Sequence, residues 1–152
     1  MHNDYKINIC RLIFVERGQM STSIWYKKKL LYDGSTSILS SLSNKIMSSL
    51  SWGGSVNDDI LAFVACLIYS TDHSLDNLST EDLRVLTLLL IKAVNELENE
   101  GYFVISARER EYLIKNNLPL DVRSDLRQAL ELIKGLTEVI EELEMERQSN
   151  VC

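Results

Sequence analysis

The chain has 152 residues, of which 45% are hydrophobic and 25% are charged, and its formal net charge is −6 at pH 7. This length and composition fit one globular domain over residues 1–152 and exclude a wholly disordered chain. The acidic balance argues against nucleic-acid binding, which draws most of its affinity from the neutralisation of phosphates.

Sequence criteria predict a cytoplasmic protein without a membrane partner. Residues 1–6 begin no apolar segment with a cleavage site, so no secretory leader is expected. The longest apolar run, residues 60–69, is about half the length that a bilayer crossing needs. Cys10, Cys66 and Cys152 are odd in number and form no CxxC pattern, which argues against a disulfide framework and a zinc site.

Residues 5–32 are predicted to form a β-hairpin. Apolar and polar residues alternate at the start of this segment, and residues 22–32 are rich in strand-favouring types. Gly18 supplies the turn between the two strands. The three lysines at 27–29 are expected on a strand edge, where they would block edge-to-edge pairing rather than bind phosphate. Because a lone hairpin is marginal in water, it must pack on helices or gain a third strand.

A helical core is predicted over residues 36–116. Its first helix, within residues 35–51, carries apolar side chains four residues apart on one stripe. The second helix is expected to begin at Ser55, to end near Thr71 and to lie at the centre of the bundle, because it is apolar on nearly every side. Cys66 is interpreted as a small core residue of this helix.

The second half of the core has clear helix boundaries. Ser79 has the spacing of a capping residue three positions before Asp82, and the helix that follows is expected to end at Gly101. Ser106 opens a further capping box and a short helix to about residue 115. Residues 102–105 are aromatic and β-branched, so they are the candidate third strand, whereas residues 72–77 are predicted to be a polar loop.

The segment 121–147 is predicted to form one long amphipathic helix. Its apolar residues alternate four and three positions apart for about three heptads, which is the spacing of a coiled-coil seam. A wide apolar stripe is equally typical of a helix that packs on its own domain, so both interpretations stay open. The candidate interaction residues of a homodimer are Val122, Leu126, Ala129, Ile133, Leu136, Ile140 and Leu143.

No catalytic, cofactor or metal site is predicted. His73 lies between Asp72 and Asp76 in the chain, but zinc requires three or four rigidly held ligands. A thiol–imidazole pair of Cys66 and His73 is not expected, because a cysteine in apolar surroundings is inert. The pair at Gly53 and Gly54 lacks the context of a phosphate-binding loop.

The sequence therefore favours an α+β, predominantly helical protein in which a hairpin or small three-stranded sheet packs on a helical bundle. Its predicted function is non-enzymatic: a small regulator or inhibitor, like an immunity protein or a phage inhibitor, that binds another protein. A basic partner would suit the net charge. One alternative is a structural subunit or secretion-type chaperone that forms helical assemblies. Another is a small-ligand binder with a pocket at a dimer interface, lined by residues such as Tyr26, Arg108 and Arg110.

Overall fold

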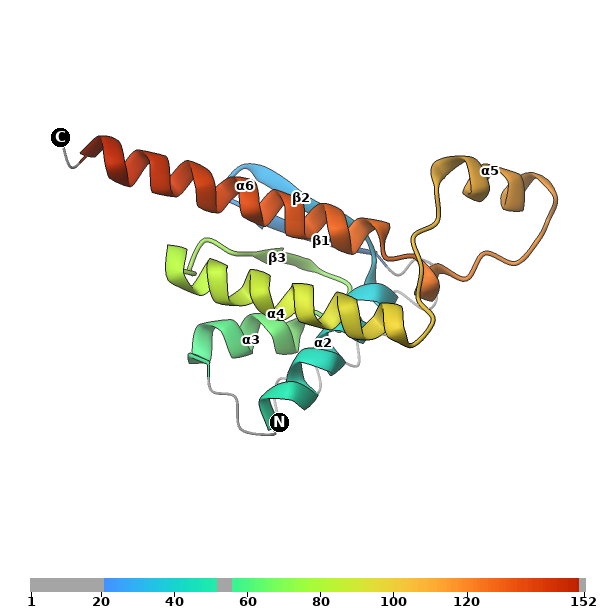
Figure 1. Ribbon diagram of the computed structural model, residues 1–152, viewed down its shortest axis with the longest axis horizontal. Helices are drawn as coiled ribbons and strands as arrows, with labels where there is room; N and C mark the ends of the chain where they lie inside the picture. Colours follow the sequence, from blue (N-terminus) through green and yellow to red (C-terminus); the bar gives the residue numbers. More distant parts are fainter. Residues whose placement is uncertain (1–20, 52–55, 151–152) are drawn as a thin grey trace.

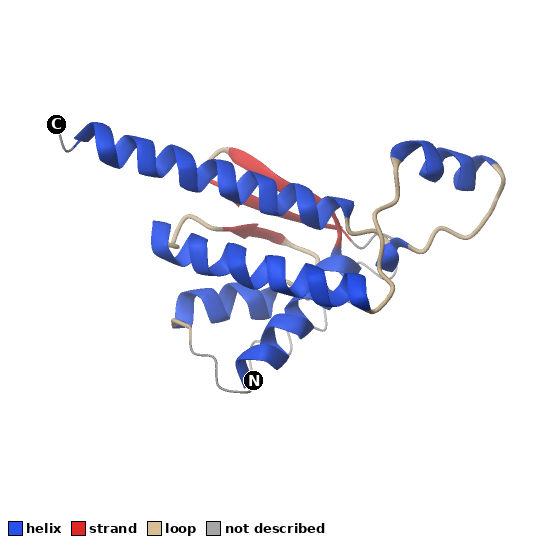
Figure 2. Cartoon of the chain, in the orientation of Figure 1, coloured by secondary structure: helices blue, strands red, loops and turns tan. Residues whose placement is uncertain are grey.

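The computed structural model describes residues 21–51 and 56–150 and confirms the predicted α+β fold, in which helices predominate (Figures 1 and 2). A small sheet with the strand order β2-β1-β3 lies beside the helices. The strands are β1 (Ser21–Tyr26), β2 (Lys29–Ser35) and β3 (Asp72–Ser74). The helices are α2 (Thr36–Ser51), α3 (Asp58–Cys66), α4 (Thr80–Asn99), α5 (Ala107–Lys115) and α6 (Arg127–Asn150), with a 3-10 turn η1 (Val122–Ser124) before α6.

The hairpin of the described chain differs from the predicted one. β1 and β2 pair antiparallel, so residues 22–32 belong to two strands and not to one. Lys27 and Lys28 form the turn, and the prediction that they lie on a strand edge is wrong. Lys27 has a positive φ of 52°, and its backbone N–H donates a hydrogen bond to the carboxylate of Asp76. The predicted strand at residues 5–15 lies outside the described residues.

The third strand is β3, and not residues 102–105. β3 runs parallel to β1, with His73 opposite Ile24, so the prediction of a polar loop at this point is wrong. Three residues are too few to show an alternating pattern, which is why the sequence does not reveal the strand. Residues 102–105 form a single isolated bridge, between Phe103 and Asp125.

Capping residues set the boundaries of α4 and α5 as predicted. The Ser79 hydroxyl accepts a hydrogen bond from the Asp82 backbone N–H at 3.1 Å, and the Asp82 carboxylate accepts one in return from the Ser79 N–H at 3.4 Å. Ser106 accepts from the Glu109 N–H at 3.1 Å at the start of α5. Gly101 follows α4 with a φ of 102°, a conformation that suits glycine after a helix.

α3 is shorter and lies further from the core than predicted. The Asn57 side chain caps it by accepting a hydrogen bond from the Ile60 N–H at 2.9 Å, while the predicted cap, Ser55, lies outside the described residues. The helix stops at Cys66, well before Thr71, because the chain turns there to bring β3 beside β1. Cys66 is exposed, so its assignment to the core is wrong. The central helix is α4, which buries seven residues.

The last helix begins at Arg127, later than the predicted residue 121. Residues 122–124 form η1, and the Asp125 carboxylate then accepts a hydrogen bond from the Arg127 N–H at 3.0 Å, which caps the start of α6. From there α6 runs along β2 and beside α4, in the opposite direction to α4 (Figure 1). Arg84 in the first half of α4 accordingly pairs with Glu144 near the end of α6.

The packing of α6 predicts unequal effects for two leucines of this helix. Leu136 is fully buried in the common core, whereas Leu130 is 39% exposed. Leu136→Ala should lower the free energy of unfolding by about 2–5 kcal/mol, because it leaves a cavity. Leu130→Ala should change it by less than about 1 kcal/mol. Denaturant unfolding of both variants checks this, and equal losses would contradict the packing described.

Candidate functional site

The predicted coiled-coil seam is largely covered by its own chain. α6 packs against β2 and against α4, and this contact uses most of the apolar stripe that a second chain would need. Dimerisation through this helix therefore stays a prediction, restricted to its exposed residues. Of the seam, Leu126, Ala129, Leu136 and Ile140 are buried, Ile133 and Leu143 are half-buried against the same core, and Val122 lies in η1.

Residues 106–121, which we call the projecting arm, extend from one end of the molecule (Figure 1). α5 forms the first part of this arm and has no buried residue. Tyr112, Ile114 and Leu118 are 62%, 60% and 44% exposed. A short helix gains stability mainly by burying an apolar face, and α5 leaves large apolar side chains in solvent.

A buried carboxylate fixes the base of the arm. Asp125 is 2% exposed and accepts hydrogen bonds from the backbone N–H groups of Ile105, at 3.4 Å, and Arg127, at 3.0 Å. The guanidinium of Arg110, in α5, pairs with its other oxygen at 3.1 Å. Because a buried charge without partners is strongly destabilising, this ion pair holds the arm in a defined position.

The hydroxyl of Tyr32 lies in the same buried region of negative charge. Burial, together with the carboxylates of Asp125 and Asp33, raises the pKa of Tyr32 well above its usual value. The hydroxyl donates a hydrogen bond to the Ser35 carbonyl at 2.5 Å. Tyr32 therefore stays protonated and supplies no additional charge to the base of the arm.

Loss of the Asp125 carboxylate should release the arm. Asp125→Ala removes three hydrogen bonds at once, so we expect the free energy of unfolding to fall by about 2–4 kcal/mol. Trypsin should also cleave within the arm faster than in the unaltered protein. Glu111→Ala, which removes an exposed carboxylate of the arm, is the matched control and should change neither quantity appreciably. Identical behaviour of the two variants would contradict the anchoring role.

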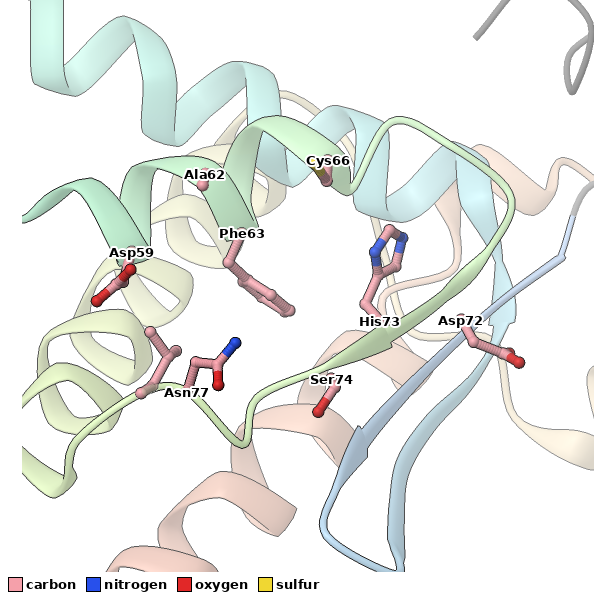
Figure 3. A pocket seen from close by; sticks show the side chains of 9 residues that line it. Asp59, Ala62, Phe63, Cys66, Asp72, His73, Ser74 and Asn77 are labelled. Atoms are coloured by element: carbon pink, nitrogen blue, oxygen red, sulfur yellow. The ribbon is translucent and has the colours of Figure 1, made fainter. Parts of the chain in front are cut away.

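A pocket of about 300 Å³ between α3 and β3 is the second candidate site (Figure 3). α3 contributes Asp59, Phe63 and Cys66, and β3 contributes Asp72 and His73. The sequence predicts no relation between Cys66 and His73, because its apolar surroundings in the sequence place Cys66 in the core. The structure instead brings both side chains to the wall of one pocket.

The imidazole of His73 is held as an uncharged group in this wall. Its Nε2 lies 3.2 Å from the Tyr69 carbonyl oxygen and 3.4 Å from the Thr71 hydroxyl oxygen. Burial lowers the pKa of His73, and the Tyr69 carbonyl and Asp72 offset this only in part. The proton therefore belongs on Nε2, and Nδ1 keeps a lone pair. The Phe63 ring packs edge-to-face on the imidazole, with a centroid distance of 6.2 Å.

Nucleophilic or metal chemistry needs further groups around Cys66 and His73. A thiol nucleophile requires a base within hydrogen-bonding reach, and the ring nitrogen left to act as one is Nδ1 of His73, because Nε2 holds its proton toward Tyr69. Within the described residues, no three His, Cys, Asp or Glu side chains lie close enough together to hold a metal ion.

The lysines of the hairpin turn face acidic residues of α6. Residues 27–29 line a groove together with Glu142 and Glu146. Lys29 also pairs with Glu138 at 3.3 Å. These glutamates balance the positive charge from within the chain, which leaves little of it for a phosphate.

Tyr26, Arg108 and Arg110, considered above as pocket residues, are not brought together within one chain. Tyr26 lines the groove at Glu142, near the end of α6. Arg110 pairs with Asp125, just before α6 begins, and Arg108 lies in α5 beside it in sequence. About 15 residues of α6, from Arg127 to Glu142, separate the two places, or roughly 22 Å at 1.5 Å per residue.

No protein-family model matches this chain, and no match is found among curated proteins or among solved structures. In residues 21–51 and 56–150, no helix combines the length and hydrophobicity that a membrane crossing needs. The function must therefore be argued from the projecting arm and from the pocket.

The protonation state of His73 gives a pH-dependent prediction. NMR titration of the ring should give a pKa below the ordinary value of 6.5, because burial disfavours the imidazolium ion. The unfolded chain then takes up the proton first, so stability from neutral His73 is complete above pH 6.5 and is lost as the pH falls through the folded-state pKa. His73→Gln should flatten this dependence, and His2→Gln assigns the signals. A ring that titrates at or above 6.5 would refute the buried neutral state.

Proposed function

We propose that the protein is a non-enzymatic binding protein that engages another protein through its projecting arm. The observation that carries this proposal is that α5 buries none of its residues in its own chain. Apolar surface gathered in one place commonly marks a protein interface. Five of the exposed large apolar side chains of the described residues lie in or just before the arm: Phe103, Val104, Tyr112, Ile114 and Leu118.

The arrangement of these side chains favours a groove on the partner. Tyr112 and Ile114 are two positions apart and both are exposed, so they point about 200° apart around α5. A flat surface could cover only one of them. A partner groove that encloses the short helix could cover both, as in other complexes where a helix binds in a groove.

The anchoring of the arm also supports a binding role. The Arg110–Asp125 ion pair holds α5 before any partner arrives, which reduces the entropy lost on binding. Residues 106–121 carry three basic and three acidic side chains, so the net charge of −6 belongs to the rest of the chain. Basic surface around the partner's groove would speed the encounter with this acidic body.

Substitution within the arm tests the proposal. The double variant Tyr112→Ser/Ile114→Ser should reduce recovery of the partner from a lysate of the source cells at least tenfold, with an unchanged circular dichroism spectrum and melting temperature. Leu88→Ser is the matched control, because Leu88 is 67% exposed on α4, outside the arm. The same partner should be recovered with the control in full. A partner retained equally by both variants would overturn the role of the arm.

Light scattering on the pure protein separates the remaining alternatives. A mass of one or two chains is expected if the arm meets a foreign partner. A dimer that the arm variant dissociates would identify a second copy as the occupant. Assemblies larger than a dimer that persist in the arm variant would favour the structural-subunit or chaperone alternative and contradict the proposal.

A further inference from the structure

The pocket between α3 and β3 has the size of a small-ligand site. Its volume of about 300 Å³ lies at the lower end of the range of ligand pockets. Figure 3 shows Phe63 and His73 side by side in its wall, with Asp59 at one side and Asp72, whose carboxylate points away from the two rings, at the other. Ligands of one functional group and a short stem fit this space.

The negative charge of the pocket wall determines which sign of charge a ligand can carry. Asp59 and Asp72 are carboxylates, and no lysine or arginine is found among the described residues that line the pocket. His73 does not counter them, because burial lowers its pKa and keeps it neutral. An anion would meet a wall that carries negative charge and no positive charge, whereas a cation would meet charge of the opposite sign.

The other polar atoms of the wall include hydrogen-bond acceptors, which favour a ligand rich in N–H groups. Nδ1 of His73 is free to accept because Nε2 carries the proton toward Tyr69. The amide of Asn77 lies in the same wall and adds a further oxygen acceptor, while the Ser74 hydroxyl accepts a hydrogen bond from the Asp76 N–H at 3.2 Å. A guanidinium or an ammonium group offers several donors and no acceptor.

The apolar part of the wall suits the stem of such a cation. Phe63 and Leu78 line the pocket, and the edge-to-face contact with His73 holds the Phe63 ring in place. An aromatic ring attracts a cation placed over its face, and the methylene groups of an alkyl stem bury well beside it. The acceptors, the negative charge of the wall and the aromatic ring thus favour one ligand chemistry.

We infer that this pocket binds a guanidinium or alkylammonium group, from the basic side chain of a protein or from a free amine. The two sources share the same chemistry, a cationic head on a short apolar stem. The pocket uses no residue of the projecting arm, so this inference stands or falls separately from the proposed function. The arm variant Tyr112→Ser/Ile114→Ser should bind such a cation unchanged.

Cys66 allows occupancy of the pocket to be measured directly. It is exposed and lines the pocket, so a bound ligand should shield its thiol from iodoacetamide. The experiment uses the full chain with Cys10→Ser and Cys152→Ser, which leaves Cys66 as the single thiol. Agmatine and the blocked peptide acetyl-Gly-Arg-Gly-amide are titrated while the rate of Cys66 alkylation and the ring signals of His73 are followed.

Saturable slowing of alkylation by at least fivefold, together with a shift of the His73 signals, is the expected result. The citrulline peptide, which is nearly isosteric but uncharged, should have no such effect. Protection by agmatine alone would identify a free amine as the source, and protection by the arginine peptide would identify a protein side chain. Absence of saturable protection by either cation, or equal protection by citrulline, would overturn the inference.

Two neighbouring carboxylates provide a matched test of the residues. Asp59 lines the pocket, while Asp58, the residue before it in α3, does not. Asp59→Asn should weaken protection by the cation at least fivefold, and Asp58→Asn should leave it within twofold. Both variants remove one negative charge from the same helical turn, so equal effects would show that net charge alone, and not the pocket, attracts the cation.

Discussion

The course of the last third of the chain depends on one buried carboxylate. Asp125 collects the N–H groups of Ile105 and Arg127 and the guanidinium of Arg110. A carboxylate as deeply buried as this one is tolerated only when such donors surround it. The strand-like segment before the arm, the arm itself and the start of α6 must therefore meet at this point. If any one of these three segments moved, the Asp125 carboxylate would lose a hydrogen-bond donor, and the other two segments would be disturbed.

This constraint also decides which surface is left for a partner. Starting at Arg127, α6 lies along β2 and α4, and its apolar stripe becomes part of the common core. The heptad-like spacing is thus compatible with intramolecular packing, as a wide stripe on a globular helix allows. Five exposed large apolar side chains of the described residues lie instead in or just before the arm, among them Tyr112 and Ile114 on a helix that the fold holds away from its body.

The sequence predicted those features that local chemistry determines. Ser79 and Ser106 cap helices through residues three positions away, and Gly101 ends a helix through its own backbone freedom. Features that depend on contacts with residues distant in the sequence could not be predicted from it. The turn at Lys27 contains neither glycine nor asparagine and is supported by Asp76 from 49 positions away. β3 exists because β1 offers an edge to pair with, which three residues cannot reveal.

The two candidate sites also combine features that neighbouring residues determine with features that depend on contacts between residues far apart in the sequence. The capping residue Ser106 makes the short helix of the arm predictable, but its exposure depends on where Asp125 anchors it. The pocket was beyond prediction, since the parallel pairing of β3 with β1 sets His73 opposite the outer face of α3 and Cys66. That pairing also buries the imidazole, which keeps it neutral beside two carboxylates. A short strand without a sequence pattern thereby creates a hollow whose wall carries two carboxylates and no lysine or arginine among the described residues.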